Sequence, residues 1–333
     1  MISIIRILTF LITFGTLTSC VVPKKFNSIQ IEILKPGVVD IPDSLKSVAV
    51  IHRNLYRSDT CVIRYSSQNA SYEHPKLGKN ELSNSCVGAL TEYLKTNGEF
   101  KTVGNYGESL NNSIDLNQEK DIPDEWFKLT NSDICIFLDF LTLRKTIISL
   151  GVTSKAYLNW SIAFKVDSGY LNYNFSDSVL LKDVVFLETL FKSSQNKKTI
   201  LNYTAESIGK YIGEKILPIW IPVERIYYLS KNEDMLLAEE FVRKNDWLKA
   251  AEIWNGKTKS KNRKLAAKAN YNMALASEME GRPDLAIDWL KKSLNGMGKY
   301  NEEHNAICKQ YLDVLAIRKQ EIERLDKQIR KQE

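Results

Sequence analysis

The stretch Asp133–Leu143 reads DICIFLDFLTL, a nearly continuous apolar run of the length of a strand. Such a run predicts a buried β-strand. Downstream, residues 157–166 alternate between apolar and polar side chains, and residues 179–187 form a third extended segment. Extended segments that follow one another at this spacing predict antiparallel pairing.

Upstream of this run, the sequence predicts a strand, a helix and a second strand. Residues 47–51 are apolar and rich in β-branched side chains, which indicates a buried strand. Residues 82–94 carry apolar side chains at steps of three and four, and Asn97-Gly98 follows, so we expect an amphipathic helix that ends there. Residues 100–103 are expected to form the next strand. This order predicts an α/β unit.

Two further segments complete a first domain, which we expect over residues 28–225. Residues 55–79 mix polar, charged and aromatic side chains without a period, so we expect a long loop. Residues 200–217 have helical periodicity and are followed by Pro218, which cannot continue the hydrogen-bond ladder of a helix.

The last hundred residues repeat at an offset of 36 residues, which separates Ala238 from Ala274 and Ala250 from Ala286. Small residues at these positions let paired helices approach closely. Gly281 is expected to make a tight turn, and Asn245 replaces it in the earlier repeat because asparagine also tolerates a left-handed conformation. The pattern resembles the tetratricopeptide repeat, whose unit is about 34 residues; an ordinary bundle of helical hairpins is the alternative.

The predicted fold class is therefore α+β: a mixed α/β domain followed by an all-α domain over residues 230–333. In the second domain, residues 301–331 are expected to form a capping helix.

The N-terminus has the features of an exported lipoprotein. Arg6 precedes an apolar run over residues 7–17, which is too short to span a membrane but has the length of a signal-peptide core. The run ends in Leu17-Thr18-Ser19-Cys20, which resembles the lipobox of bacterial lipoproteins. We expect a signal peptide over residues 1–19, lipid on Cys20 and a tether over residues 20–27; an ordinary signal with a chance cysteine is the alternative.

The chain also resembles an uncharacterised family of Bacteroidota lipoproteins. The resemblance is carried by Leu34-Lys35-Pro36, Ile41-Pro42, residues 46–53, Leu217-Pro218-Ile219-Trp220 and residues 223–228. It implies an α/β domain similar in layout to those of outer-membrane-associated lipoproteins in secretion and wall-synthesis machinery. It implies no catalytic residues, because the family has no established activity. In lipoproteins of this type an early acidic run resembles a surface-export tag, and no acidic residue lies between Val21 and Lys25, so the resemblance implies a protein that faces the periplasm. We expect it on the outer membrane.

The sequence offers little that indicates catalysis, a cofactor or a metal. His52, His74 and His304 are far apart, and no phosphate-binding loop or nucleophile elbow is present. Asp133 and Asp139 would lie about 20 Å apart along one strand, too far for a carboxylate pair. We therefore expect a protein that is not an enzyme and needs no cofactor, although plentiful acidic residues leave a hydrolase open.

Composition adds two expectations. A net charge of +6 over 333 residues is too small to favour nucleic acid as a partner. Cys135 and Cys308 are expected to be small buried side chains, and a disulfide between Cys61 and Cys86 is left open.

These observations favour a membrane-anchored adaptor that binds another envelope protein through the concave face of its helical repeats. Tyr271 and Asn272 are expected to line that groove. The alternative is an envelope sensor or small-ligand binder with a pocket in the α/β domain, between the long loop and the sheet.

Overall fold

The computed structural model describes residues 25–53, 60–65, 70–73, 80–106, 122–148, 151–181, 195–297 and 301–329. The chain divides into two compact units. The helical unit contains the chain up to Ile31 together with Val223–Ala316, and the α/β unit contains Glu32–Pro222 together with Ile317–Glu333. In this division the residues up to Ile31 fall in the helical unit and the residues from Ile317 onward fall in the α/β unit. The expected domain bounds, 28–225 and 230–333, stay a prediction.

The α/β unit is built on a mixed sheet with the order β4-β3-β6-β2-β5, to which β7 adds on β6 and β8 adds on β7. Its strands are β2 (Ser47–His52), β3 (Thr60–Tyr65), β4 (Ala70–Glu73), β5 (Thr102–Asn105), β6 (Ile134–Ile148), β7 (Gly151–Val166) and β8 (Gly169–Leu181). One side of β6 pairs along its length with β7. On its other side, β6 pairs in parallel first with β2 and then with β3.

The expected strands at 47–51, 133–143 and 157–166 are confirmed as β2, β6 and β7, and the expected antiparallel pairing is confirmed for β6, β7 and β8. The third expected segment, 179–187, overlaps only the end of β8, which begins at Gly169, and residues 182–187 lie outside the described residues. The expectation of a loop over residues 55–79 is wrong, because β3 and β4 lie within it. Their segments are short and show no clear alternation of apolar side chains. They are strands because the length of β6 beyond β2 offers a free edge for pairing.

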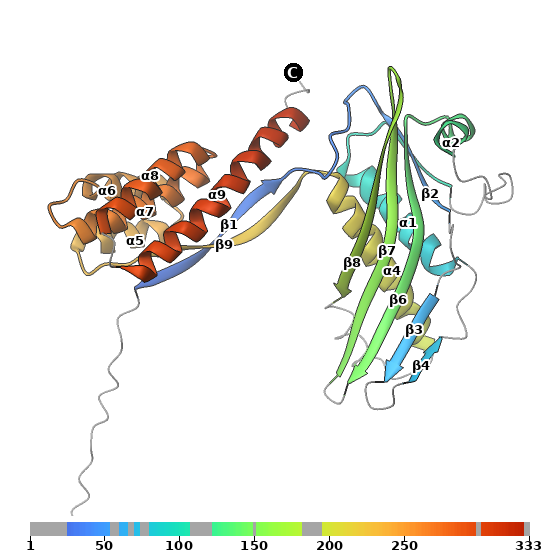
Figure 1. Ribbon diagram of the computed structural model, residues 1–333, viewed down its shortest axis with the longest axis horizontal. Helices are drawn as coiled ribbons and strands as arrows, with labels where there is room; N and C mark the ends of the chain where they lie inside the picture. Colours follow the sequence, from blue (N-terminus) through green and yellow to red (C-terminus); the bar gives the residue numbers. More distant parts are fainter. Residues whose placement is uncertain are drawn as a thin grey trace, which may run out of the picture. The chain divides into compact units, whose positions relative to one another are not determined.

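Helices cover both faces of the sheet, as Figure 1 shows. On one face, α1 (Glu81–Asn97) and α4 (Gln195–Ile216) pack on Val48 and Val50. On the other face, α2 (Ile122–Thr130) places Trp126 against Phe137 of β6. Because side chains alternate along a strand, β2 is buried on both faces, which explains its continuous apolar sequence.

The helices α1 and α4 pack closely because α4 carries a glycine at their contact. A Cβ atom on Gly209 would lie 2.1 Å from the backbone carbonyl oxygen of Cys86, so no larger residue fits without displacement of a helix. The expected apolar face of α1 is confirmed: Leu82, Cys86, Leu90 and Leu94 are all buried.

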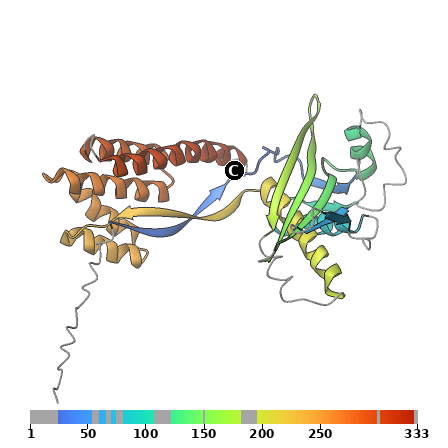
Figure 2. The same ribbon diagram turned by 60° about the horizontal axis from the view of Figure 1, so that its bottom comes forward.

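The helical unit consists of two helical hairpins and the first part of a long helix (Figure 2). The helices are α5 (Glu233–Arg243), α6 (Trp247–Lys257), α7 (Arg263–Met279), α8 (Pro283–Met297) and α9 (Glu302–Ile329). The four alanines of the repeat, Ala238, Ala250, Ala274 and Ala286, are fully buried. Asn245 and Gly281 have φ angles of 59° and 70°, so the left-handed turns expected from the sequence are confirmed.

Two remaining strands, β1 (Phe26–Lys35) and β9 (Ile219–Tyr228), pair with each other in a separate two-stranded sheet. The structure carries Cys61, Cys86, Cys135 and Cys308 as buried thiols. Within the described ranges, no helix is both long and apolar enough to cross a membrane.

Candidate functional site

Tyr271 and Asn272, which the sequence placed in a partner-binding groove, contact the chain's own strand β9. The Asn272 side chain accepts a hydrogen bond from the Tyr228 amide at 2.7 Å and donates one to the Tyr228 carbonyl at 3.0 Å. The Tyr271 ring packs edge-on against the Tyr228 ring, with 5.1 Å between centroids. Both side chains are almost completely buried. A partner contact at these residues stays a prediction, and it would have to replace the contacts that β9 makes now.

Beside this strand lies a buried charged network. Arg225 donates two hydrogen bonds to the Glu278 carboxylate, at 2.7 and 2.8 Å, and the Tyr311 hydroxyl donates a third at 2.6 Å. Burial, followed by the charge of Glu278, raises the pKa of Tyr311 well above its usual value. The network thus holds a neutral tyrosine and an ion pair that links Arg225 of β9 to Glu278 of α7.

A cysteine and a histidine also lie close together in the helical unit. His304 Nε2 is 3.4 Å from the Cys308 thiol, and His304 Nδ1 is 2.6 Å from the Tyr228 hydroxyl. Burial raises the pKa of Cys308 to about 11 and lowers the pKa of His304 below its usual value. Because both groups are therefore neutral near pH 7, the pair lacks the thiolate that nucleophilic catalysis requires.

In the α/β unit, Asp139 lies in a β-bulge of β6 and forms a buried ion pair with Arg53 at 2.6 Å. The Phe137 ring lies 4.1 Å from the guanidinium carbon of Arg53. Burial raises the pKa of Asp139, although Arg53 acts in the opposite direction. Asp133 has a different partner: its carboxylate accepts hydrogen bonds from the Ser47 hydroxyl and amide. The two aspartates therefore have separate structural partners.

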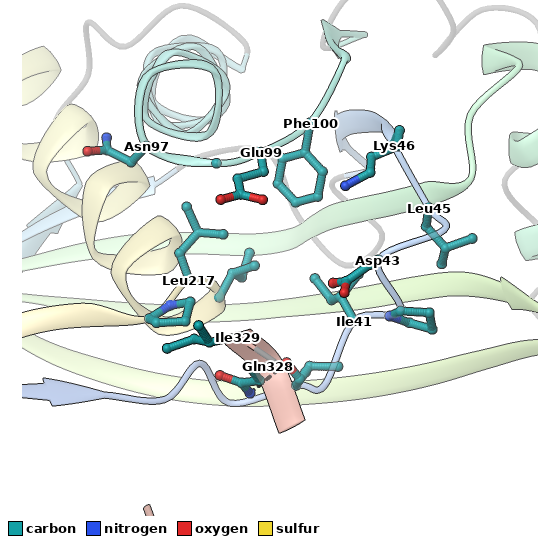
Figure 3. A pocket seen from close by; sticks show the side chains of 15 residues that line it. Ile41, Asp43, Leu45, Lys46, Asn97, Glu99, Phe100, Leu217, Gln328 and Ile329 are labelled. Carbon is teal, nitrogen blue, oxygen red and sulfur yellow. Dashed lines mark hydrogen bonds between the residues drawn. The ribbon is translucent and has the colours of Figure 1, made fainter. Parts of the chain in front are cut away.

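The α/β unit contains a cavity of about 360 Å³, shown in Figure 3. Four segments form its walls: residues 39–46, which precede β2; residues 97–100, between α1 and β5; residues 216–218, at the end of α4; and residues 328–329 of α9. The apolar part of the lining is Val39, Ile41, Pro42, Leu45, Phe100, Ile216, Leu217, Pro218 and Ile329.

Hydrogen bonds hold the segment before β2 in place. The Val38 amide donates to the Lys215 carbonyl at the end of α4, at 2.7 Å. Gly37 lies so close to α4 that a Cβ atom there would be 2.0 Å from the Ile216 carbonyl oxygen. Gln328 accepts from the Gly37 amide at 3.1 Å and donates to the Asp40 carboxylate at 2.6 Å. The end of α9 thus fixes one wall of the cavity.

Three charged side chains, Asp43, Lys46 and Glu99, project toward the cavity from different segments (Figure 3). None of them forms an ion pair with a residue that the structure describes. The Asp43 oxygen Oδ2 is buried and accepts no hydrogen bond. Buried polar atoms almost always have a partner, so this oxygen is available to a bound group.

The cavity differs in place from the expected pocket, because none of the described residues between 55 and 79 lines it. Much of that stretch lies outside the described residues. The signal that could have found the cavity was in the resemblance: Ile41-Pro42, Lys46 and Leu217-Pro218 belong to the motifs that carried it, and all line the cavity. Cys20 also lies outside the described residues. Within the described part of the chain, no cluster of three metal-binding side chains occurs.

Comparison with known proteins identifies the family. A family described as a domain of unknown function (DUF8603) matches residues 45–228. The chain belongs to this family. A second domain of unknown function (DUF6340) matches residues 237–317, which begin in α5 and end in α9. The expectation of a family without established activity is confirmed, whereas its place in the Bacteroidota and the tetratricopeptide likeness stay predictions.

Other comparisons add little. No curated protein matches the chain. Among solved structures, a minor lipoprotein from Acinetobacter baumannii is similar at 10% identity, over 54% of this chain and 98% of that one, with a TM-score of 0.20. A TM-score this low supports no statement about the fold or function of this chain.

Proposed function

We propose that this protein is a lipid-anchored lipoprotein of the bacterial envelope that acts as a non-catalytic adaptor for another envelope protein. The support for the anchor is the short apolar run that ends in Leu17-Thr18-Ser19-Cys20. Acylation of a cysteine by several chains holds a protein stably on a membrane, whereas one chain holds only marginally. The proposed location is the outer membrane, with the protein facing the periplasm.

The observation that carries the adaptor role is the open edge of β8. This strand of 13 residues pairs with β7 along one side, and no described strand pairs with its other side. Tyr170, Leu171, Tyr173 and Leu180 are between 36% and 55% exposed. An edge strand offers a row of backbone donors and acceptors to an extended segment of another protein, and exposed apolar side chains add contact area.

The composition of β8 fits such pairing. Asp177 is its one charged residue, and the strand contains neither lysine nor proline. Edge strands that avoid association commonly carry a lysine, a proline or a bulge, since each of these obstructs a new neighbour. The partner that best fits β8 is therefore an uncharged, extended segment of an envelope protein.

The inner face of the helical unit, where the sequence predicted a partner, is partly occupied by the chain itself. This face already holds β9 through Asn272 and Tyr228. A small hollow of about 180 Å³ remains beside β9, lined in part by Ile307, Gln310 and Val314. A partner side chain could enter this hollow without displacing the strand.

The adaptor role can be tested with photo-crosslinking residues placed in the protein in living cells. We expect a crosslinker at Asn174, on the edge of β8, to give one dominant partner. A crosslinker at Gln310 tests the helical hollow, and one at Tyr203, an exposed residue of α4, serves as the control. The same products from all three positions, or none from Asn174 and Gln310, would contradict the proposal.

The anchor has a separate test. Substitution Cys20→Ala should move the protein from the membrane fraction to the soluble fraction. Mass spectrometry of the mature protein should find acyl chains on an N-terminal Cys20. An unmodified Cys20, or a chain that keeps its signal peptide, would show that the lipoprotein assignment is wrong.

A second candidate function, the binding of a small ligand, is favoured by the cavity of the α/β unit. Ligand sites in proteins are concave, mostly apolar and carry a few convergent polar groups. The cavity combines apolar side chains with a few polar and charged groups. Ligand binding and an adaptor role are compatible, because β8 contributes no residue to the cavity lining.

A further inference from the structure

We propose that the cavity of the α/β unit binds an amino-acid-sized zwitterion that carries an apolar side chain. This inference rests on the ligand-binding candidate function and adds the chemical class of the ligand. Its basis is the set of charges around a cavity that is lined by apolar as well as polar side chains.

Charged side chains of both signs face the cavity. Asp43 and Glu99 supply two carboxylates, and Lys46 supplies one ammonium group. No described residue forms an ion pair with any of the three. Opposite charges held near one cavity, and not within ion-pairing distance of each other, are complementary to a molecule that has both charges on one small frame.

Each charged end of a zwitterion has a matching side chain in the cavity. A ligand ammonium group can donate to the carboxylates of Asp43 and Glu99, and the orphaned Oδ2 of Asp43 is the acceptor that most needs such a donor. A ligand carboxylate is the matching partner for the ammonium group of Lys46. The Phe100, Leu217 and Ile41 side chains then remain for the apolar side chain of the ligand.

The same lining disfavours other classes of ligand. A phosphate-bearing ligand would meet two carboxylates and a single lysine, which disfavours its negative charge. A purely apolar ligand would cover charged groups and leave them unpaired, which is costly. The cavity volume of about 360 Å³ is near the lower end for ligand sites, so a small molecule fits better than a long lipid.

Hydrogen bonds within the protein hold the cavity walls in place without a ligand. Arg324 donates a hydrogen bond to the Gly37 carbonyl at 2.7 Å, and Gln328 donates to the Val39 and Gly37 carbonyls as well as to Asp40. A site that is already ordered loses less conformational entropy on binding, which favours affinity for a small ligand.

The experiment uses the purified mature protein and isothermal titration with four probes that share a phenyl group. They are L-phenylalanine, phenethylamine, 3-phenylpropionate and 2-phenylethanol. We expect L-phenylalanine to bind about tenfold more tightly than any of the others, because only it can satisfy both kinds of charge. The substitutions Asp43→Asn and Lys46→Met should each weaken its binding at least about fivefold.

Glu206→Gln is the matched control, since it removes an exposed carboxylate of α4 that does not line the cavity. It should leave the affinity unchanged, and the melting temperature of each variant shows whether it still folds. Unfolded cavity variants would be replaced by Glu99→Gln, which lies at the turn after α1.

The outcomes separate the two levels of the proposal. Equal or tighter binding of a probe with one charge or none keeps the ligand-binding function and overturns the zwitterion. Binding of L-phenylalanine that Asp43→Asn and Lys46→Met leave unchanged overturns the assignment to this cavity. Failure of all four probes at millimolar concentration overturns the zwitterion, and the ligand-binding function would then require a ligand of another class.

Discussion

Asn272 of α7 makes two hydrogen bonds to the backbone of one residue, Tyr228 of β9: it accepts from the amide at 2.7 Å and donates to the carbonyl at 3.0 Å. This pairing satisfies both backbone polar groups of one buried residue, as a neighbouring strand would. The inner face of the helical unit thus recognises extended backbone, and the backbone that it holds belongs to the same chain.

We expect Asn272→Ala to destabilise the protein by about 2–4 kcal/mol, because it leaves a buried amide and a buried carbonyl without partners. Urea denaturation of the purified protein measures this loss. Gln310→Ala, at an exposed position of α9, is the control and should change stability little. A loss below about 0.5 kcal/mol for Asn272→Ala would show that water replaces both hydrogen bonds.

Two glycines should respond to alanine in opposite directions. Gly209→Ala places a Cβ atom against the Cys86 carbonyl oxygen, and we expect a loss of about 1–3 kcal/mol from overpacking between α1 and α4. Gly256→Ala meets nothing within 4 Å in α6, and we expect a gain of about 0.5–1 kcal/mol from helix propensity. Thermal unfolding compares both with the wild type; equal effects would contradict the close approach of the two helices.

The stability of the helical unit should fall as the pH drops below neutrality. Burial lowers the pKa of His304, so the unfolded state takes up a proton at a higher pH than the folded state. The stabilisation from neutral His304 is therefore present above the unfolded pKa of about 6.5 and is lost as the pH falls toward the folded pKa.

Urea denaturation at several values between about pH 8 and pH 5 measures this slope. His304→Asn removes the titrating group and should flatten it relative to the wild type. A nuclear magnetic resonance titration should place the pKa of His304 below its usual value. An unchanged slope in the variant would assign the pH dependence to other groups.

The end of α9 should control the order of the cavity wall. Gln328→Ala removes the hydrogen bonds to Gly37 and Asp40, and we expect faster amide hydrogen exchange over residues 37–43. Gln320→Ala changes the same residue type at an exposed position of the same helix and should leave the exchange unchanged. Identical exchange in both variants would show that α4 and Gly37 suffice to hold the wall.

Local structure in this protein was predictable from neighbouring residues. The apolar run at residues 133–143 specified β6, and the spacing of Leu82, Cys86, Leu90 and Leu94 specified the buried face of α1. The 36-residue offset of the alanines and the turns at Asn245 and Gly281 specified the two helical hairpins. These features were predictable because side-chain periodicity and left-handed turns depend on residues close together in the chain.

Contacts between distant segments were not predictable in this way. β3 and β4 became strands because β6 extends beyond β2 and offers an edge, which no local pattern encodes. Asn272 was expected to line a partner groove, and it hydrogen-bonds to Tyr228 of β9, which lies 44 residues earlier in the chain. The cavity brings Asp43, Glu99 and Gln328 together from three distant parts of the chain. Contacts between distant segments depend on long-range packing. The periodicity of side chains within one helix or strand carries no information about them.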